Sequence, residues 1–272
     1  MQKTIASYIV DSFTKETFKG NPAGVCILEE SLDPEDMQNI AIELGLSETA
    51  FVSYNPDSDK YAIRYFSPKV EIPLCGHATL ASAKVIFDQN PQVNTIEFLT
   101  IEQLTLIVQR IGEEIQMIFP IYNTTPQEAP DSLLKALGLK TITNSEYNKE
   151  TNILLLEIDD VDVLQKLSPN FEALKKAHDT INGVLLTALS NKPDYDFESR
   201  YFWPWSGTNE DPVTGGTHTF LAKYWCDRLG KTKLSSFQCS ARSGFMDLEL
   251  KNNEELLITS NAQIVFKGEL YL

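Results

Sequence analysis

The sequence predicts an α/β (α+β) protein of two pseudo-symmetric lobes, each a strand-rich, barrel-like sheet around one buried central helix. Residues 64–68 (Arg-Tyr-Phe-Ser-Pro) recur as residues 200–204 (Arg-Tyr-Phe-Trp-Pro), an offset of 136 in a chain of 272. A glycine-containing turn and then a small-residue or mixed apolar helix pattern follow each copy. The shared order of strand, proline, acidic loop, glycine turn and helix favours a duplicated fold.

Three helices stand out from their boundary residues and apolar patterns. The first begins at Asp33-Pro34, which supply an N-cap and a proline at the first helical position, and it ends at Gly45. The second covers 77–87, where small or apolar residues on every side predict a helix that is buried almost all round. The third covers 217–229, with a glycine just past its end.

Strands are expected where β-branched and aromatic residues cluster between turn residues. These segments are 49–54, 61–66, 95–99, 104–108, 115–119, 153–158, 183–188, 197–202, 245–250 and 255–258. The pattern breaks at 123–126 (Asn-Thr-Thr-Pro), which predicts the boundary between the lobes. We therefore expect an N-terminal lobe at 1–124 and a C-terminal lobe at 125–272.

Composition and charge narrow the classes of partner. The net charge of −15 opposes binding to nucleic acid or to an anionic membrane surface, although a local positive site can still bind a small anion. The N-terminus lacks an apolar signal core, and no run approaches the roughly 18 apolar residues of a membrane span. The four cysteines are scattered at Cys26, Cys75, Cys226 and Cys239. Free thiols in a reducing cytoplasm are therefore expected.

The two glycine turns are candidate anion sites. A helix that begins after such a turn directs free backbone N–H groups outward and carries partial positive charge. The turns at Gly76 and at Gly215-Gly216 each precede an expected helix. If they face a common cleft between the lobes, they can hold a carboxylate group and stabilise charge that develops beside it.

Acid–base candidates lie near these turns. His77 and His218 stand at the starts of the two expected helices. Glu48 directly precedes an expected strand, and Asp211 lies in a turn before a proline. By composition alone, Glu48 and Asp211 are ordinary turn residues. The residues themselves thus indicate two anion-binding turns and a few acid–base groups, without a substrate.

Motifs along nearly the whole chain resemble the PhzF (phenazine biosynthesis-like) family. They are residues 10–14, 18–26, 46–51, 64–68, 71–80, 210–215 and 237–240. The resemblance implies the two-lobed fold of diaminopimelate epimerase and proline racemase. It also implies a homodimer and chemistry without a metal, nucleotide or pyridoxal cofactor.

The resemblance further implies a cofactor-independent isomerase that moves a proton on a small, cyclic carboxylate substrate. Glu48 matches the main acid–base residue of the family. His77 and Asp211 match residues that bind and polarise the substrate or relay protons. Gly76 and Gly215 match glycines at the lips of the cleft, where we expect them to bind the substrate.

Gly216 departs from the family pattern and leaves the substrate open. The family commonly has a substrate-contacting serine at this position. Gly216 keeps the backbone N–H, so we expect it to bind substrate as well, but it has no hydroxyl.

Two other functions remain open. A racemase or epimerase needs an acid–base residue on each side of a carbon, typically a pair of thiols. Cys75 occupies one such place, but its partner place holds Thr214, so a thiol pair is disfavoured and a Cys–Thr dehydratase remains. A non-catalytic binding protein is the third alternative.

Overall fold

The computed structural model describes residues 3–206 and 208–272. The chain forms two compact units, one of residues 1–118 with 258–272 and the other of residues 119–257. The expected lobes at 1–124 and 125–272 differ from this grouping mainly at the C-terminus. Residues 258–272 belong to the first unit because strand β18 (Ala262–Tyr271) pairs with β1 (Thr4–Ser12).

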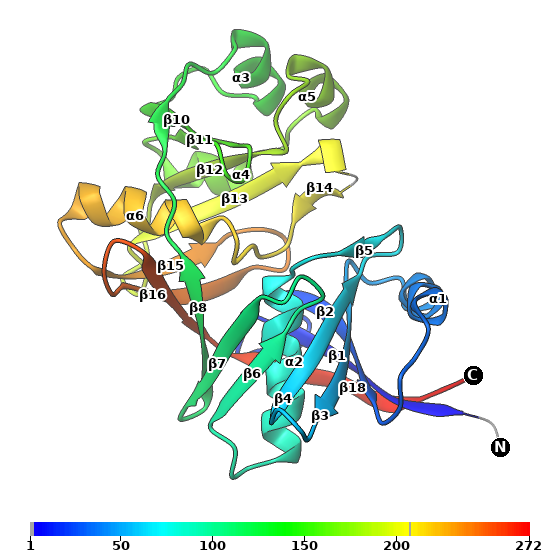
Figure 1. The fold of residues 1–272 in the computed structure, drawn as a ribbon. Helices are drawn as coiled ribbons and strands as arrows, with labels where there is room; N and C mark the ends of the chain where they lie inside the picture. The colour runs from blue at the N-terminus through cyan, green and yellow to red at the C-terminus, as the bar shows by residue number, and fades with distance from the viewer. Residues whose placement is uncertain (1–2, 207) are drawn as a thin grey trace. The chain divides into compact units, whose positions relative to one another are not determined.

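The first unit is a set of strands around one helix (Figure 1). Besides β1 and β18, its strands are β2 (Asn21–Leu28), β3 (Thr49–Asn55), β4 (Lys60–Phe66), β5 (Glu71–Ile72), β6 (Thr95–Leu99), β7 (Thr105–Ile111) and β8 (Glu114–Pro120). Helix α2 (Gly76–Gln89) packs against β1, β2, β3, β7 and β18. Helix α1 (Pro34–Leu44) covers the opposite side of the sheet, where Met37 and Ile40 pack with Phe51 and Phe66.

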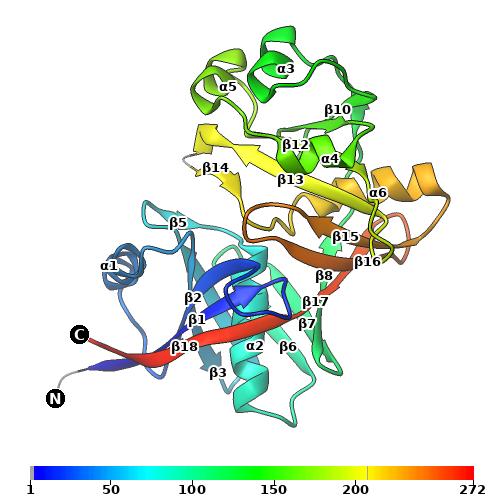
Figure 2. The ribbon, with the colours of Figure 1, turned by 180° about the vertical axis from the view of Figure 1, so that it is seen from behind.

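The second unit is also built from strands with helices packed on them, and it has more helices than the first unit (Figure 2). Its strands are β9 (Thr125–Pro126), β10 (Asn144–Asn148), β11 (Ile153–Glu157), β12 (Gly183–Leu189), β13 (Phe197–Trp203), β14 (Thr208–Asp211), β15 (Lys233–Gln238), β16 (Gly244–Leu250) and the first half of β17 (Glu255–Ser260), which continues into the first unit. Its helices are α3 (Asp131–Leu137), α4 (Val161–Lys166), α5 (Phe171–Ala177), the short 3₁₀ helix η1 (Pro204–Ser206) and α6 (His218–Leu229).

Alternating side chains place helices on both faces of the second sheet. Leu154 and Leu186 pack into the apolar cluster formed with α3, α4 and α5. Thr187, the next residue along β12, points to the other face because successive side chains alternate. There its hydroxyl accepts a 2.9 Å hydrogen bond from the indole N–H of Trp225 on α6, and the Trp225 ring stacks on Phe197.

The two units share their strand pairing around the repeated motif. β4 pairs with β5 antiparallel and with β6 parallel, as β13 does with β14 and β15. The guanidinium of Arg64 binds both carboxylate oxygens of Glu71 at 2.7 and 2.8 Å, and Arg200 binds Glu210 at the same two distances. The α/β fold class expected from the duplication is confirmed.

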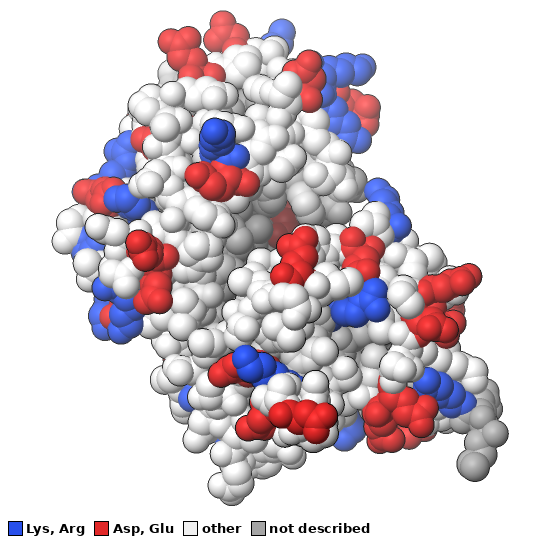
Figure 3. Space-filling model, in the orientation of Figure 1, with Lys and Arg blue, Asp and Glu red and all other residues white. Residues whose placement is uncertain are grey.

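Charges are mixed on the surface that Figure 3 shows, where acidic and basic side chains lie interspersed. Within residues 3–206 and 208–272, no helix is long and apolar enough to cross a membrane.

Candidate functional site

Glu48 and His77 meet in the first unit. Glu48 directly precedes β3, and its backbone carbonyl accepts a 3.0 Å hydrogen bond from the N–H of Gly24. His77 is the second residue of α2, and its carbonyl accepts a 2.7 Å hydrogen bond from the hydroxyl of Ser12. These anchors bring Nε2 of His77 to 3.2 Å from Oε2 of Glu48, with side chains only 10% and 14% exposed, respectively.

The other neighbours of the imidazole hold it in place. Cys75 Sγ lies 3.4 Å and the amide nitrogen of Asn21 3.5 Å from Nδ1 of His77. Burial lowers the pKa of His77, and the nearby Glu48 carboxylate opposes this effect. A neutral imidazole can donate from Nε2 to Glu48 and accept the Asn21 amide at Nδ1.

The first turn of α2 displays backbone donors beside this pair. Cys75 precedes the helix in an extended conformation and offers no capping side chain. The N–H groups of Gly76 and His77 have no partner within the helix, because the first turn of any helix leaves them without one. The hydroxyl of Thr79 donates to the carbonyl of Cys75 at 2.7 Å and steadies the start of the turn.

Asp211 and Thr214 form the corresponding cluster in the second unit. The Thr214 hydroxyl donates to the Asp211 carboxylate. Gln238 at the end of β15 fixes both residues: its amide oxygen accepts from the Thr214 N–H at 2.9 Å, and its amide nitrogen donates to the Asp211 carbonyl at 2.8 Å. Asp211 is thus a buried carboxylate that a hydroxyl donor holds in a defined position.

The second glycine turn leads into α6. Gly215 is buried, whereas Gly216 is exposed, and a Cβ built on Gly216 would meet no atom within 4 Å. The backbone N–H groups of His218 and Thr219 are already bonded to the carbonyls of Gly215 and Gly216. The exposed glycine therefore leaves room for a ligand or a larger side chain.

His218 belongs to the core and not to this turn. Its ring is fully buried, and Nδ1 lies 3.0 Å from the carbonyl of Thr214. Burial lowers the pKa of His218 to about 4, with the Thr214 carbonyl acting in the opposite direction. A neutral, enclosed imidazole suits packing against Phe197.

The sequence-predicted residues thus fall into two groups. Glu48, Gly76 and His77 belong to the first unit, and Asp211, Gly215 and Gly216 belong to the second. A common pocket for the two glycine turns stays a prediction. Sequence reasoning missed the contacts of Ser12, Asn21 and Gln238. Each of the three lies in a motif that resembles the PhzF family, and no other signal in the sequence marks them.

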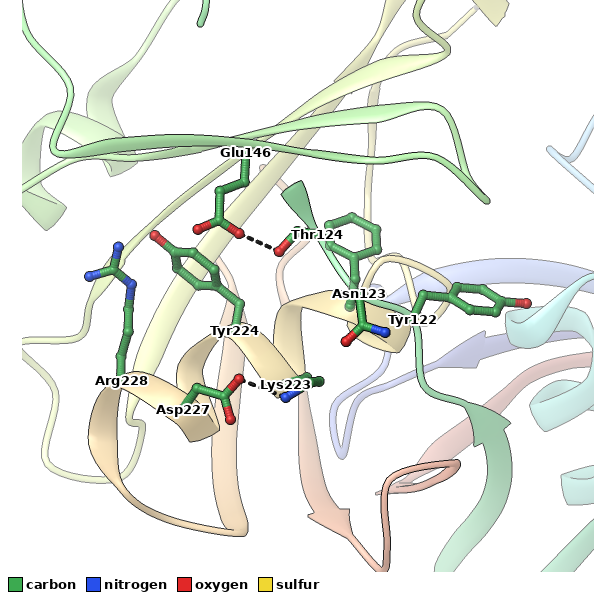
Figure 4. Close-up of a pocket in the computed structure, with 9 residues that line it drawn as sticks. Tyr122, Asn123, Thr124, Glu146, Lys223, Tyr224, Asp227 and Arg228 are labelled. Atoms are coloured by element: carbon green, nitrogen blue, oxygen red, sulfur yellow. Dashed lines mark hydrogen bonds and ion pairs between the residues drawn. The ribbon is translucent and has the colours of Figure 1, made fainter. Parts of the chain in front are cut away.

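The second unit also contains a cavity of about 440 Å³ beside the outer face of α6 (Figure 4). None of the predicted site residues lines it. Its charged side chains are already engaged: Thr124 donates to Glu146, and Lys223 pairs with Asp227 at 2.7 Å. This cavity therefore offers little uncompensated charge to a ligand.

Comparisons with known proteins match the whole chain. Residues 10–268 match the PhzC-PhzF family model, described as phenazine biosynthesis-like protein. The chain is 42% identical to an uncharacterized isomerase of Pseudomonas aeruginosa, over 100% of both chains. It is 41% identical to phenazine biosynthesis-like domain-containing protein 2 of Mus musculus, over 97% of this chain and 98% of that protein.

Solved structures agree in fold. A PhzF family protein of Enterococcus faecalis superposes with a TM-score of 0.92 and 39% identity, over 99% of this chain and 100% of that one. A hydroxyproline epimerase from Agrobacterium vitis has a TM-score of 0.61 and 11% identity, over 100% of this chain and 94% of that one. This second similarity shows a shared fold alone.

Proposed function

Because the chain belongs to the PhzC-PhzF family of phenazine biosynthesis-like proteins, we propose that it is a cofactor-independent isomerase that moves a proton on a small, cyclic carboxylate. Relatives named as isomerases support the reaction class. The observation that carries the proposal is the 3.2 Å approach of His77 Nε2 to the Glu48 carboxylate at the start of α2.

In this mechanism Glu48 is the proton carrier. Its carboxylate removes a proton from one carbon of the substrate and returns it to a neighbouring atom on the same face. His77, as a neutral imidazole, donates to Glu48 and keeps one carboxylate oxygen aligned. General acid–base catalysis of this kind contributes about 10²–10⁴-fold in rate.

The remaining predicted residues have binding roles in the proposal. The backbone N–H of Gly76, in the first turn of α2, binds the substrate carboxylate as helix-start donors do for anions. Gly215 and Gly216, in the turn before α6, bind the substrate through their own backbone N–H groups. Asp211, held by Thr214, polarises the substrate. The proposal also includes a homodimer in the cytoplasm, and sedimentation of the purified protein tests whether the chain is a dimer.

A deuterium experiment tests the reaction class even while the product is unidentified. The protein is incubated in deuterated water with a panel of cyclic and amino-acid carboxylates. NMR then follows both deuterium at carbon and new product signals, because a shielded transfer can return the same proton. We expect turnover of at least one substrate, and its loss by at least about 10²-fold in Glu48→Gln.

Glu43→Gln is the matched control, because Glu43 is an exposed glutamate on α1 and should be replaceable without effect. If Glu48→Gln turns over the substrate as fast as Glu43→Gln, proton transfer by Glu48 is wrong. If no carboxylate in a broad panel reacts, the non-catalytic binding alternative replaces the isomerase.

A further inference from the structure

Three side chains of different metal-binding types converge where α2 begins. A carboxylate oxygen of Glu48, Sγ of Cys75 and a ring nitrogen of His77 all lie within 4.8 Å of one another. Among residues 3–206 and 208–272, this is the cluster of histidine, cysteine and acidic side chains that could hold a metal ion. We propose that Glu48, Cys75 and His77 form a binding site for a single Zn²⁺ ion.

The separations fit one tetrahedral ion. Zinc binds nitrogen and oxygen at about 2.0–2.2 Å and thiolate sulfur at about 2.3 Å, so neighbouring ligands of a tetrahedral ion lie about 3.3–3.7 Å apart. Nε2 of His77 lies 3.2 Å from Oε2 of Glu48 and 3.9 Å from Sγ of Cys75. Sγ of Cys75 also lies 3.4 Å from Nδ1, so the Cys75 side chain must rotate toward Nε2 before all three atoms reach one ion. A fourth position then stays open for water.

The donor types select the metal. A thiolate and an imidazole favour zinc and the late transition metals, whereas magnesium and calcium prefer oxygen donors alone. Binding displaces the proton of Cys75 to solvent and leaves Nε2 of His77 unprotonated. The ring proton then resides on Nδ1, beside the side-chain amide of Asn21, which can present its oxygen to that proton.

The backbone holds the three ligands in place before metal binds. Cys75 and His77 flank the first residue of α2, and Thr79 bonds back to the Cys75 carbonyl. Ser12 fixes the His77 carbonyl, and the Gly24 N–H fixes that of Glu48. Metal binding thus requires reorientation of side chains alone.

Occupancy by zinc would inhibit the enzyme; this consequence rests on the proposed function. The ion would use the carboxylate oxygen and the ring nitrogen that face each other at 3.2 Å. A metal-bound carboxylate cannot carry a proton to and from the substrate. Zinc would therefore act as a reversible inhibitor that a chelator removes, and not as a catalytic cofactor.

Binding is tested without any substrate. Co²⁺ is added to the reduced, full-length protein, because a cobalt–thiolate bond gives a charge-transfer band in the near ultraviolet. Calorimetry then measures Zn²⁺ and Mg²⁺ binding. We expect the cobalt band in the wild type, one zinc per chain, and zinc binding at least about 100-fold tighter than magnesium binding.

Cys75→Ala should remove the cobalt band and weaken zinc binding at least about tenfold, and His77→Gln should weaken zinc binding similarly. Cys226→Ala is the matched control, since Cys226 is a buried cysteine of α6 in the second unit, and it should keep both signals. Circular dichroism and thermal melting of each metal-free variant show that it is folded.

A cobalt band that persists in Cys75→Ala, or zinc that binds no more tightly than magnesium, would overturn the zinc site. The two proposals fail separately. An active enzyme without zinc binding contradicts only the metal site, and zinc binding by a protein that turns over no carboxylate contradicts only the isomerase.

Discussion

Nε2 of His77 lies 3.2 Å from Oε2 of Glu48, and the two side chains reach this contact from segments 29 residues apart in the chain. Burial lowers the pKa of His77, so the ring is neutral near pH 7. The contact is then a hydrogen bond from a neutral imidazole to a carboxylate. A bond of this kind orients the carboxylate and leaves its negative charge available to accept a proton.

Comparison of Glu48→Gln with Cys75→Ala separates proton transfer by a carboxylate from racemisation by a thiol. On a substrate found by the deuterium screen, Glu48→Gln should lose at least about 10²-fold in kcat with binding roughly kept. Cys75→Ala should stay within about tenfold, or 1.4 kcal/mol in barrier, because the Thr214 hydroxyl is bonded to Asp211 and is no second thiolate base. An inactive Cys75→Ala together with an active Glu48→Gln would require the racemase-like alternative.

Gly216 and Gly183 should respond oppositely to an added side chain. A Cβ on Gly216 meets nothing within 4 Å, so Gly216→Ser should change the free energy of unfolding by less than about 0.5 kcal/mol. A Cβ on Gly183 would lie 2.5 Å from the hydroxyl oxygen and a ring carbon of the buried Tyr201, so Gly183→Ala should cost about 1–3 kcal/mol. Urea unfolding measures both, and equal costs would contradict the open space at Gly216.

The two equivalent arginine–glutamate pairs should differ in strength. Arg64 and Glu71 are each 25% exposed, so Glu71→Gln should cost no more than about 1 kcal/mol. Arg200 and Glu210 are 10% and 18% exposed, and Arg200 also donates to the carbonyls of Leu164 and Leu167. Glu210→Gln should therefore cost at least about 2 kcal/mol, because it leaves a more enclosed cation without its partner.

Chemical denaturation of the two glutamine variants ranks the pairs. Glu210→Gln should unfold at the lower denaturant concentration. The reverse order would show that the exposure of the two side chains does not determine how much each ion pair contributes to the free energy of unfolding.

His218 should make stability depend on pH between about 6.5 and 4. Burial lowers the pKa of His218 to about 4, whereas an unfolded histidine titrates near 6.5. In this window the unfolded chain binds one proton more than the folded chain, so stability falls as pH falls, by about 1.4 kcal/mol per pH unit and about 3 kcal/mol in total.

Unfolding free energies measured across this pH range check the prediction. His218→Gln should flatten the slope by about one proton. Parallel slopes in wild type and His218→Gln would contradict the prediction.

Sequence alone predicted the parts of the fold with local signals. Helices α1, α2 and α6 lie within two residues of the expected ranges. Pro34 and Gly45 mark the two ends of α1, and the small or apolar residues on every side of α2 predict a helix that is buried almost all round. β1 was missed because buried polar residues interrupt its apolar pattern. Ser7 and Ser12 bond to backbone carbonyls, and Asp11 accepts the N–H of Phe18.

The short helices of the second unit were missed for a different reason. α4 and α5 have six and seven residues, which is too few for an apolar period to stand out. Their stability comes from tertiary packing, because Leu164 of α4 and Leu174 of α5 join the apolar cluster that contains Leu154 of β11 and Leu186 of β12. β18 was missed because exposed side chains dominate its second half.

The candidate site could be predicted only in outline. From the residues, Glu48 was an ordinary turn glutamate, and the family resemblance alone singled it out. Its contact with His77 depends on how β3 and α2 pack, which no local pattern encodes. Gln238 was unassigned for the same reason, since its bonds to Asp211 and Thr214 join β15 to a distant turn.

The return of β18 to β1 also has a consequence for biosynthesis. The second unit is continuous in the chain, whereas the first unit needs a strand that the ribosome produces only after all of the second. During translation the second unit can fold while β1 still has an unpaired edge, and such edges promote aggregation. The nascent first unit, with Glu48 and His77 in it, is thus the part that most needs protection until synthesis reaches β18.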